Sequence, residues 1–355
     1  MSFPESTVPL DDEYRDTLEY CGRTFHKYSL ETGTYFAPVD EEEVERLELM
    51  HNVLSKVFDN RLIFPPMAAP RSILDCGCGS ANWAVDVAEK HPDCEGLHTT
   101  TEIAAAIATN GSVFLLMLER FANVLGIDVS PHMLPEHSPR NLDFQIDDLN
   151  ARFDRKNPVG CCNRWLTVEA GLRFREIRSI LFTARWLLEG YVRDIYRVTK
   201  PGGWCQIVEL YLNAQSDNGR LTYSEWIRRF HCREWKAAKR CGCADHALSK
   251  WSSRYLNTLS PRKNPRAALH MAGWMESAGF VDIESKLITL PMSDWPTEAR
   301  DQRIGRANRE NVKELLETAA LYPLTEQTKM PMEEFEQLIS MARDEAGDPG
   351  LKVGR

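Results

Sequence analysis

The chain has 355 residues, of which 43% are hydrophobic and 27% charged, and its formal net charge is −9. This length and balance suit a globular protein with a sizeable core, and the acidic excess argues against general nucleic-acid binding. The ten cysteines are expected to be reduced thiols. The polar N-terminus has no signal-peptide pattern, and the most apolar window, 103–118, is too short for a membrane span of roughly 20 residues. We expect a cytoplasmic protein, with the nucleus as the open alternative, that binds neither nucleic acid nor membrane.

The N-terminal region, residues 1–60, is interpreted as a tail and a helical cap. Residues 1–18 read as a loosely held tail, and Asp40 can cap a helix whose first turn is Glu41–Glu43. Residues at helical spacing then predict an amphipathic helix: Val44, Leu47, Met50 (or His51) and Leu54. The aromatic residues before it are expected to anchor the segment rather than line a site: Tyr28, Tyr35 and Phe36.

The most informative stretch is RSILDCGCGSANW, residues 71–83. An apolar run that ends in Asp75 is followed by Gly77 and Gly79, and then by a segment from Ala81 that can form a helix. This is the strand–turn–helix order of a nucleotide-binding unit, in which glycines let the backbone turn and approach a ligand.

Asp75 and Asn82 narrow the choice of ligand at this turn. A carboxylate at the strand end would repel a phosphate group, and Asn82 stands where the NAD fingerprint has Gly or Ala. A ligand with a cationic amino group and no phosphate fits better, and S-adenosylmethionine is such a ligand. A nicotinamide oxidoreductase is therefore disfavoured, although an ordinary tight turn remains the simplest alternative.

Two further strands are predicted to end in carboxylates. The run 124–127 ends in Asp128, which lies 49 positions beyond Gly79 instead of the usual distance of about 20, so an insertion is expected at about 96–123. Residues 141–146 alternate like a third strand and lead into Asp148 and Leu149. A carboxylate there can accept a hydrogen bond from an adenine amino group, and a capped turn is the alternative.

No fourth strand is evident from the sequence. Residues 177–198 hold a helical period, and the segment 155–190 replaces the expected strand. The arginines of this region are interpreted as a solvated helix face. Trp204–Tyr211 is predicted as a buried strand, 213–266 as a lid, Ala267–Gly279 as a helix and Phe280–Leu290 as an extended strand. The tail is predicted as two helices with caps near Thr297 and Met332.

No metal site and no catalytic base are assigned. One set of possible zinc ligands occurs in the sequence: Cys232, Cys241, Cys243 and His246. It lacks the paired C-x₂-C spacing of zinc sites, so we do not assign a metal to it. Three histidines are available as bases, but none lies in a motif that fixes its role: His26, His231 and His246.

Several ordered motifs resemble one family. ILDCGCGSANWAV, VLGIDVSP, FQIDDLN and YRVTKPGGWCQIVELY resemble motifs of class I S-adenosylmethionine-dependent methyltransferases. GRTFHKYSLETGTYFAPVDEEEVERLELMH, AGFVDI, GRANRENVKELLE and LYPLTEQ resemble its fungal branch, which includes natural-product methyltransferases and the velvet-associated regulator of secondary metabolism. Ala81 replaces the third glycine of the first motif, and the fourth and last strands have no match.

The resemblance implies an α/β fold with a Rossmann-like, seven-stranded sheet. Residues 61–355 would form the methyltransferase domain, with insertions at about 96–123 and 155–190. A retained intron in these insertions is a hypothesis that sequencing the mature transcript would test. The resemblance also implies S-adenosylmethionine as cofactor. Its methionine moiety would lie at Asp75 and the Gly77–Gly79 turn, its ribose at Asp128, and its adenine at Asp148 and Leu149.

Two functions follow from this resemblance. The first is methyl transfer to a small-molecule acceptor in fungal secondary metabolism. The alternative is a regulatory protein on the same fold that acts through a protein partner, with or without catalysis.

Overall fold

The computed structural model describes most of the chain. The described residues are 12–66, 73–92, 124–149, 174–181, 188–219, 221, 246–260 and 262–354. Among them, no helix is long and apolar enough to cross a membrane.

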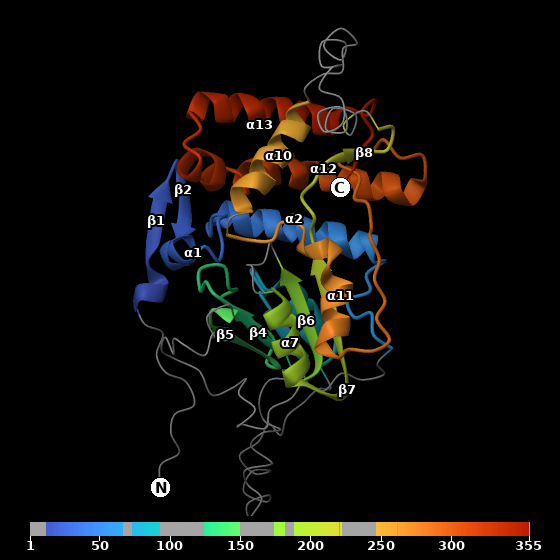
Figure 1. Ribbon diagram of the computed structural model, residues 1–355. Coiled ribbons are helices and arrows are strands. Elements are labelled where there is room, and N and C mark those ends of the chain that lie inside the picture. The colour runs from blue at the N-terminus through green and yellow to red at the C-terminus, as the bar shows by residue number, and fades with distance from the viewer. Residues whose placement is uncertain are drawn as a thin grey trace, which may run out of the picture.

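A parallel five-stranded sheet forms the centre of the structure (Figure 1). Its strand order is β5-β4-β3-β6-β7, which matches strands 3-2-1-4-5 of a Rossmann-like sheet, with the order reversing between β3 and β6. The strands are β3 (Ile73–Cys76), β4 (Val124–Asp128), β5 (Leu142–Ile146), β6 (Phe174–Leu181) and β7 (Thr199–Glu209). The predicted α/β fold class is confirmed.

Helices cover both faces of this sheet. On one face α3 (Asn82–Lys90) packs its Trp83, Ala84 and Val87 against Ile73 and Val124. On the other face lie α7 (Leu188–Val198), η3 (Ala267–Leu269) and α11 (Met271–Ala278). Ligands of such folds bind outside the carboxyl ends of the strands, at the point where the strand order reverses.

A third group of helices lies beyond the carboxyl ends of the strands, with α2 nearest to the sheet in Figure 1. Together with the N-terminal elements these helices build the largest apolar core. The helices are α2 (Glu41–Val57), α10 (Ala247–Leu259), α12 (Ala299–Thr318), the π-helical η4 (Leu321–Gln327) and α13 (Met332–Gly347). The N-terminal elements are η1 (Asp12–Arg15), β1 (Thr17–Tyr20), β2 (Arg23–His26) and α1 (Lys27–Thr32), and β8 (Gln215–Ser216) pairs with β9 (Val353–Gly354).

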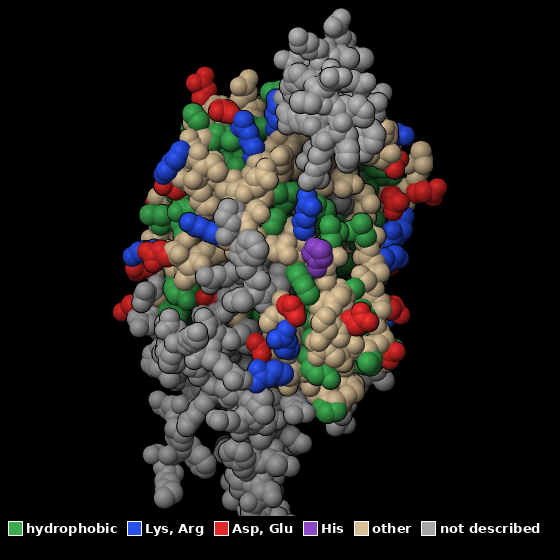
Figure 2. All heavy atoms as spheres, in the orientation of Figure 1, with side chains coloured by type: hydrophobic (Ala, Val, Ile, Leu, Met, Phe, Trp, Pro, Cys, Tyr) green, Lys and Arg blue, Asp and Glu red, His purple; other side chains and the backbone are tan. Residues whose placement is uncertain are grey.

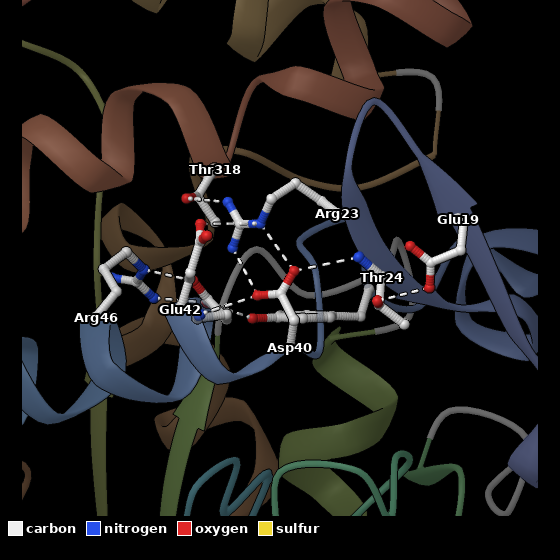
Figure 3. Close-up of polar contacts among 9 residues, drawn as sticks. Glu19, Arg23, Thr24, Asp40, Glu42, Arg46 and Thr318 are labelled. Atoms are coloured by element: carbon white, nitrogen blue, oxygen red, sulfur yellow. Dashed lines mark hydrogen bonds and ion pairs between the residues drawn. The ribbon is translucent and has the colours of Figure 1, made fainter.

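The α2 helix begins as the sequence predicts. The Asp40 side chain accepts a hydrogen bond from the Glu43 backbone N–H at 3.1 Å. Its carboxylate also receives two 2.7 Å bonds from Arg23 of β2 and one from the Thr24 N–H (Figure 3). Arg23 reaches Thr318 at the end of α12 as well. One carboxylate therefore joins the N-terminal hairpin to α2, and Arg23 extends the network to the C-terminal helices.

The fourth strand corrects the sequence prediction. β6 occupies residues 174–181, inside the segment 155–190, and pairs in parallel with both β3 and β7. The helix predicted from residue 177 begins only at Leu188. The sequence FREIRSIL obscures the strand, because a central parallel strand normally reads as a nearly continuous apolar run. Residues 174–181 therefore belong to the central sheet. The prediction that the segment 155–190 replaces the fourth strand is wrong for these residues.

Two other expectations need correction. The N-terminal hairpin begins at Thr17, inside the segment predicted as a tail. Residues 281–290 form no strand, because no strand among the described residues pairs with them, and Val281 and Leu287 are left 80% and 76% exposed. The resemblance implies a sheet of seven strands, whereas the central sheet of the described residues has five.

The arginines of α7 lie on a solvated helix face, as interpreted from the sequence. Arg193 pairs with Glu189 at 2.9 Å and Arg197 with Asp194 at 2.8 Å. On the face formed by α7 and α11, Figure 2 shows acidic, basic and hydrophobic side chains interspersed. This face thus offers no continuous basic patch.

Candidate functional site

The turn after β3 has the geometry that its glycines predict. Gly77 and Gly79 have φ values of +75° and +56°, and Ala81 is also left-handed at +60°. The Gly77 and Cys78 N–H groups donate to the Ile127 carbonyl at 2.7 and 3.0 Å. These bonds tie the turn to the end of β4. Ala81 can hold the position of the missing third glycine, although a left-handed residue with a Cβ costs roughly 1–2 kcal/mol.

Three carboxylates lie near the carboxyl ends of adjacent strands of the sheet, on the side of this turn. Asp75 lies in β3, Asp128 ends β4, and Asp148 follows β5 by two residues; these strands are parallel neighbours. Asp75 and Asp148 are buried, at 1% and 3% exposure. Burial and then the charges of Asp128 and Asp75 raise the pKa of the Cys78 thiol, so both carboxylates act on the turn.

Asp128 holds the glycine turn through its side chain. Its Oδ2 accepts from the Gly79 N–H at 2.8 Å and its Oδ1 from the Ser130 N–H at 3.0 Å. Burial raises the pKa of Asp128, while these backbone hydrogen bonds oppose the shift. The three N–H groups of the turn at Gly77, Cys78 and Gly79 therefore all donate within the protein.

Asp148 and Leu149 follow the end of β5, as the sequence predicts. Leu149 packs against the apolar cluster that contains Leu74 and Ile127. The Asp148 carboxylate accepts a hydrogen bond from the Tyr28 hydroxyl of α1 at 3.1 Å. Tyr28 thus contacts a predicted site residue, in addition to the anchoring role expected for it.

The α2 helix covers the turn. Leu47 lies so close to Gly79 that a Cβ built there would sit 3.7 Å from its Cδ1. One turn earlier, Glu43 and Arg46 form a fully buried ion pair with contacts of 2.7 and 2.8 Å. The Tyr35 hydroxyl donates to Glu43 at 2.9 Å, and burial, Glu43 and then the Asp128 charge raise its pKa.

A small cavity of about 20 Å³ lies beside this ion pair. Lys263, only 2% exposed, lines it and donates to the Thr34 carbonyl at 2.8 Å. Its ammonium also lies 5.0 Å from the centre of the Phe36 ring. Burial lowers the pKa of Lys263 to about 7, although the Glu209 charge at the end of β7 opposes the shift.

The candidate bases from the sequence have structural partners or lie outside the described residues. His26 is buried and contacts the Ser29 hydroxyl at 2.7 Å and the Tyr14 carbonyl at 2.9 Å. His246 contacts Glu345 of α13 at 3.2 Å. His231 and the three cysteines of the zinc pattern are not among the described residues, in which no group of three metal-ligating side chains occurs.

The sequence did not indicate the partners of Tyr28 and Lys263, although Tyr28 was considered for an anchoring role. Tyr28 bonds a residue 120 positions away and Lys263 one 229 positions away. No short motif encodes such pairs. The only sequence signal was the aromatic cluster before α2.

The comparisons with known proteins agree with the motifs. The secondary metabolism regulator laeA of Monascus pilosus is 26% identical over 327 residues, covering 92% of this chain and 72% of that protein. The protein-methionine methyltransferase laeA of Emericella nidulans is 25% identical, with coverages of 92% and 70%. The methyltransferase pytC of Aspergillus terreus is 24% identical, with coverages of 92% and 81%. No family model matches the chain.

Among solved structures, phosphoethanolamine N-methyltransferase 2 of Haemonchus contortus aligns with a TM-score of 0.35 at 13% identity, covering 86% of this chain and 50% of that chain. The fold assignment above comes from the strand order of this chain itself. By sequence, the chain is similar to the fungal secondary-metabolism regulators and methyltransferases that include laeA and pytC.

Proposed function

We propose that the chain is an S-adenosylmethionine-dependent methyltransferase that acts on a small-molecule acceptor in fungal secondary metabolism. The names of its relatives support this class of activity. One structural observation favours S-adenosylmethionine over a dinucleotide. The Gly79 N–H donates to the Asp128 carboxylate, whereas in a dinucleotide site an N–H group at this turn would donate to a phosphate. A ligand without phosphate fits this edge.

The residues at the edge match the parts of S-adenosylmethionine. Asp75 would face the cationic amino group, Asp128 the ribose hydroxyls, and Asp148 with Leu149 the adenine ring. Carboxylates accept hydrogen bonds from hydroxyl and amino groups, and all three stand at the ends of adjacent strands. The cofactor would supply an activated methyl group on sulfur.

The protein's contribution to such a reaction is alignment and exclusion of water. Holding an acceptor in line with a methyl group removes much of the entropic part of the barrier, and the α2 layer over the turn shields this edge. A base is required only for an acceptor that must lose a proton. We assign none.

Calorimetry with S-adenosylhomocysteine and NAD tests the cofactor. We expect binding of the first and not of NAD, and at least about tenfold weaker binding in Asp128→Ala, since a hydrogen bond to a charged group is worth roughly 1.5–3 kcal/mol. Asp143→Ala removes an exposed carboxylate from the neighbouring edge strand β5; it is the control and should bind normally. Binding of NAD alone would overturn the proposal.

A second candidate function is a regulatory protein that works through a protein partner. The naming of several relatives as secondary metabolism regulators favours it, and the Emericella nidulans relative is named for methylation of protein methionine. Tight binding of the cofactor product without turnover of any metabolite in a fungal extract would favour this function. We place the protein in the cytoplasm or the nucleus, which a fluorescent fusion would decide.

A further inference from the structure

The N-terminal cap reaches the cofactor edge through one side chain. Tyr28 of α1 donates its hydroxyl to Asp148 Oδ2 at 3.1 Å. Asp148 is 3% exposed and Tyr28 is half-buried, so the accepting carboxylate is shielded from water. In Figure 1 the N-terminal elements lie on the side of the sheet where β5 is the edge strand. The cap therefore touches the residue that the proposed function assigns to adenine.

The Tyr28 side chain is held in place by its own neighbours. Its ring packs against Tyr14 of η1, with ring centres 4.6 Å apart. His26 in turn bridges the two segments, since it contacts the Tyr14 carbonyl at 2.9 Å and the Ser29 hydroxyl of α1 at 2.7 Å. Burial and the adjacent Asp148 charge raise the pKa of Tyr28 above its ordinary value, so the phenol stays a donor over the working pH range.

This contact has a consequence for what Asp148 can recognise. An ionised carboxylate only accepts hydrogen bonds, and its two oxygens offer about four acceptor positions. A donor fixed on Oδ2 restrains rotation of the carboxylate and leaves its other acceptor positions for a ligand. An adenine ring presents a 6-amino donor to such a group, whereas a hypoxanthine ring presents a 6-oxo acceptor that the carboxylate repels.

We propose that Tyr28 is a positioning residue that sets the preference of this site for a 6-amino purine by holding the Asp148 carboxylate. The inference rests on the proposed function, in which Asp148 faces the adenine ring. It adds the N-terminal cap to the cofactor site. It also predicts that a loss of the hydroxyl changes selectivity, which a purely structural role of Tyr28 would not do.

The test compares two ligands that differ only at purine position 6, S-adenosylhomocysteine and S-inosylhomocysteine. The ratio of their dissociation constants is measured by calorimetry for the wild type and for Tyr28→Phe. The proposed bond from the 6-amino group to the Asp148 carboxylate corresponds to roughly 10- to 100-fold in binding. Without Tyr28 the carboxylate is no longer held for this bond, so we expect the preference for the adenosyl ligand to fall by about tenfold. Tyr20→Phe is the control, because its hydroxyl bonds Thr325 at 3.0 Å, away from the site.

An unchanged ratio in Tyr28→Phe would overturn the inference, even if both ligands bound more weakly. Failure of the wild type to bind either ligand would overturn the cofactor assignment itself, together with the inference. Amide hydrogen exchange of the wild type gives a readout that needs no variant. The α1 amides should exchange more slowly with the adenosyl ligand than with the inosyl ligand, and equal rates would refute the role of Tyr28.

Discussion

Asp40 joins three parts of the N-terminal cap, and its removal gives a calculable loss of stability. Asp40→Ala deletes the N-cap bond to Glu43, which is worth about 1 kcal/mol. It also leaves the Arg23 guanidinium, only 13% exposed, without its two 2.7 Å bonds, at roughly 1.5–3 kcal/mol. The expected loss in the free energy of unfolding is therefore about 2.5–4 kcal/mol.

Urea unfolding followed by circular dichroism measures this loss, and Glu42→Ala is the matched control. Glu42 stands two residues further along α2 and lies 3.4 Å from the same Arg23, but it is 75% exposed. An exposed pair of this kind contributes about 0–1 kcal/mol. At a slope near 3 kcal/mol per M urea, Asp40→Ala should lower the midpoint by about 1 M. Equal midpoints for the two variants would refute the reasoning.

The same contact predicts a pH dependence. Burial alone would raise the pKa of Asp40, but the hydrogen bonds from Arg23 and from the Thr24 N–H hold it below its ordinary value. A carboxyl group whose pKa is lower in the folded state stabilises the protein above its unfolded pKa of about 3.9 and loses this effect as the pH falls through its folded pKa. The stability gap between wild type and Asp40→Ala should therefore narrow below about pH 4.

The remaining predictions concern glycines and Lys263. Gly305→Ala in α12 would place a Cβ 2.0 Å from the Ser293 carbonyl, so it should cost more than about 2 kcal/mol in thermal unfolding. Gly273→Ala in α11, where the Cβ meets nothing within 4 Å, should instead be neutral or stabilise by up to about 1 kcal/mol; equal effects would contradict this contrast. Burial lowers the pKa of Lys263 to about 7, so above pH 7 the folded state loses this proton while the unfolded state keeps it. The stability of the wild type relative to Lys263→Met should therefore rise above pH 7, by up to about 1.4 kcal/mol per pH unit. A stability difference that stays constant between pH 7 and 10 would argue against this reasoning. Gly79→Ala strains a residue at φ +56° beside Leu47 and should weaken S-adenosylhomocysteine binding at least tenfold. Gly202→Ala, at φ +72° in open surroundings, carries a similar backbone strain and should bind that ligand normally.

Local patterns in the sequence predicted the parts of the fold that local physics determines. The Asp40 cap, the apolar run before Gly77 and the left-handed turn all appear as expected. β4 and β5 also lie within a residue of their predicted bounds. These elements depend on spacing and on conformational preference, both of which are readable in one chain.

The misread elements are those whose state depends on distant partners. β6 is a strand because β3 and β7 pair with it on both sides, although its own charged residues suggest a helix face. Residues 281–290 have strand-like composition but no partner strand among the described residues. The Tyr28–Asp148 and Lys263–Thr34 contacts likewise join residues far apart in sequence, so the candidate site could be predicted from its turn and not from its cap. The roles of Asp75, Gly77, Gly79, Asp128, Asp148 and Leu149 toward a cofactor stay predictions.

The hydrogen bonds between the N-terminal elements and the C-terminal helices have a consequence for synthesis on the ribosome. Tyr20 bonds Thr325 and Arg23 bonds Thr318, across 305 and 295 residues, and Arg46 of α2 bonds Asn311 of α12. The α2 helix leaves the exit tunnel well before α12, yet Arg46 gains its buried partner Asn311 only when α12 follows. The nascent chain must therefore keep an incomplete cap in solution until α12 has been synthesised, while the β3–β7 sheet, which precedes α12 in the sequence, can already assemble.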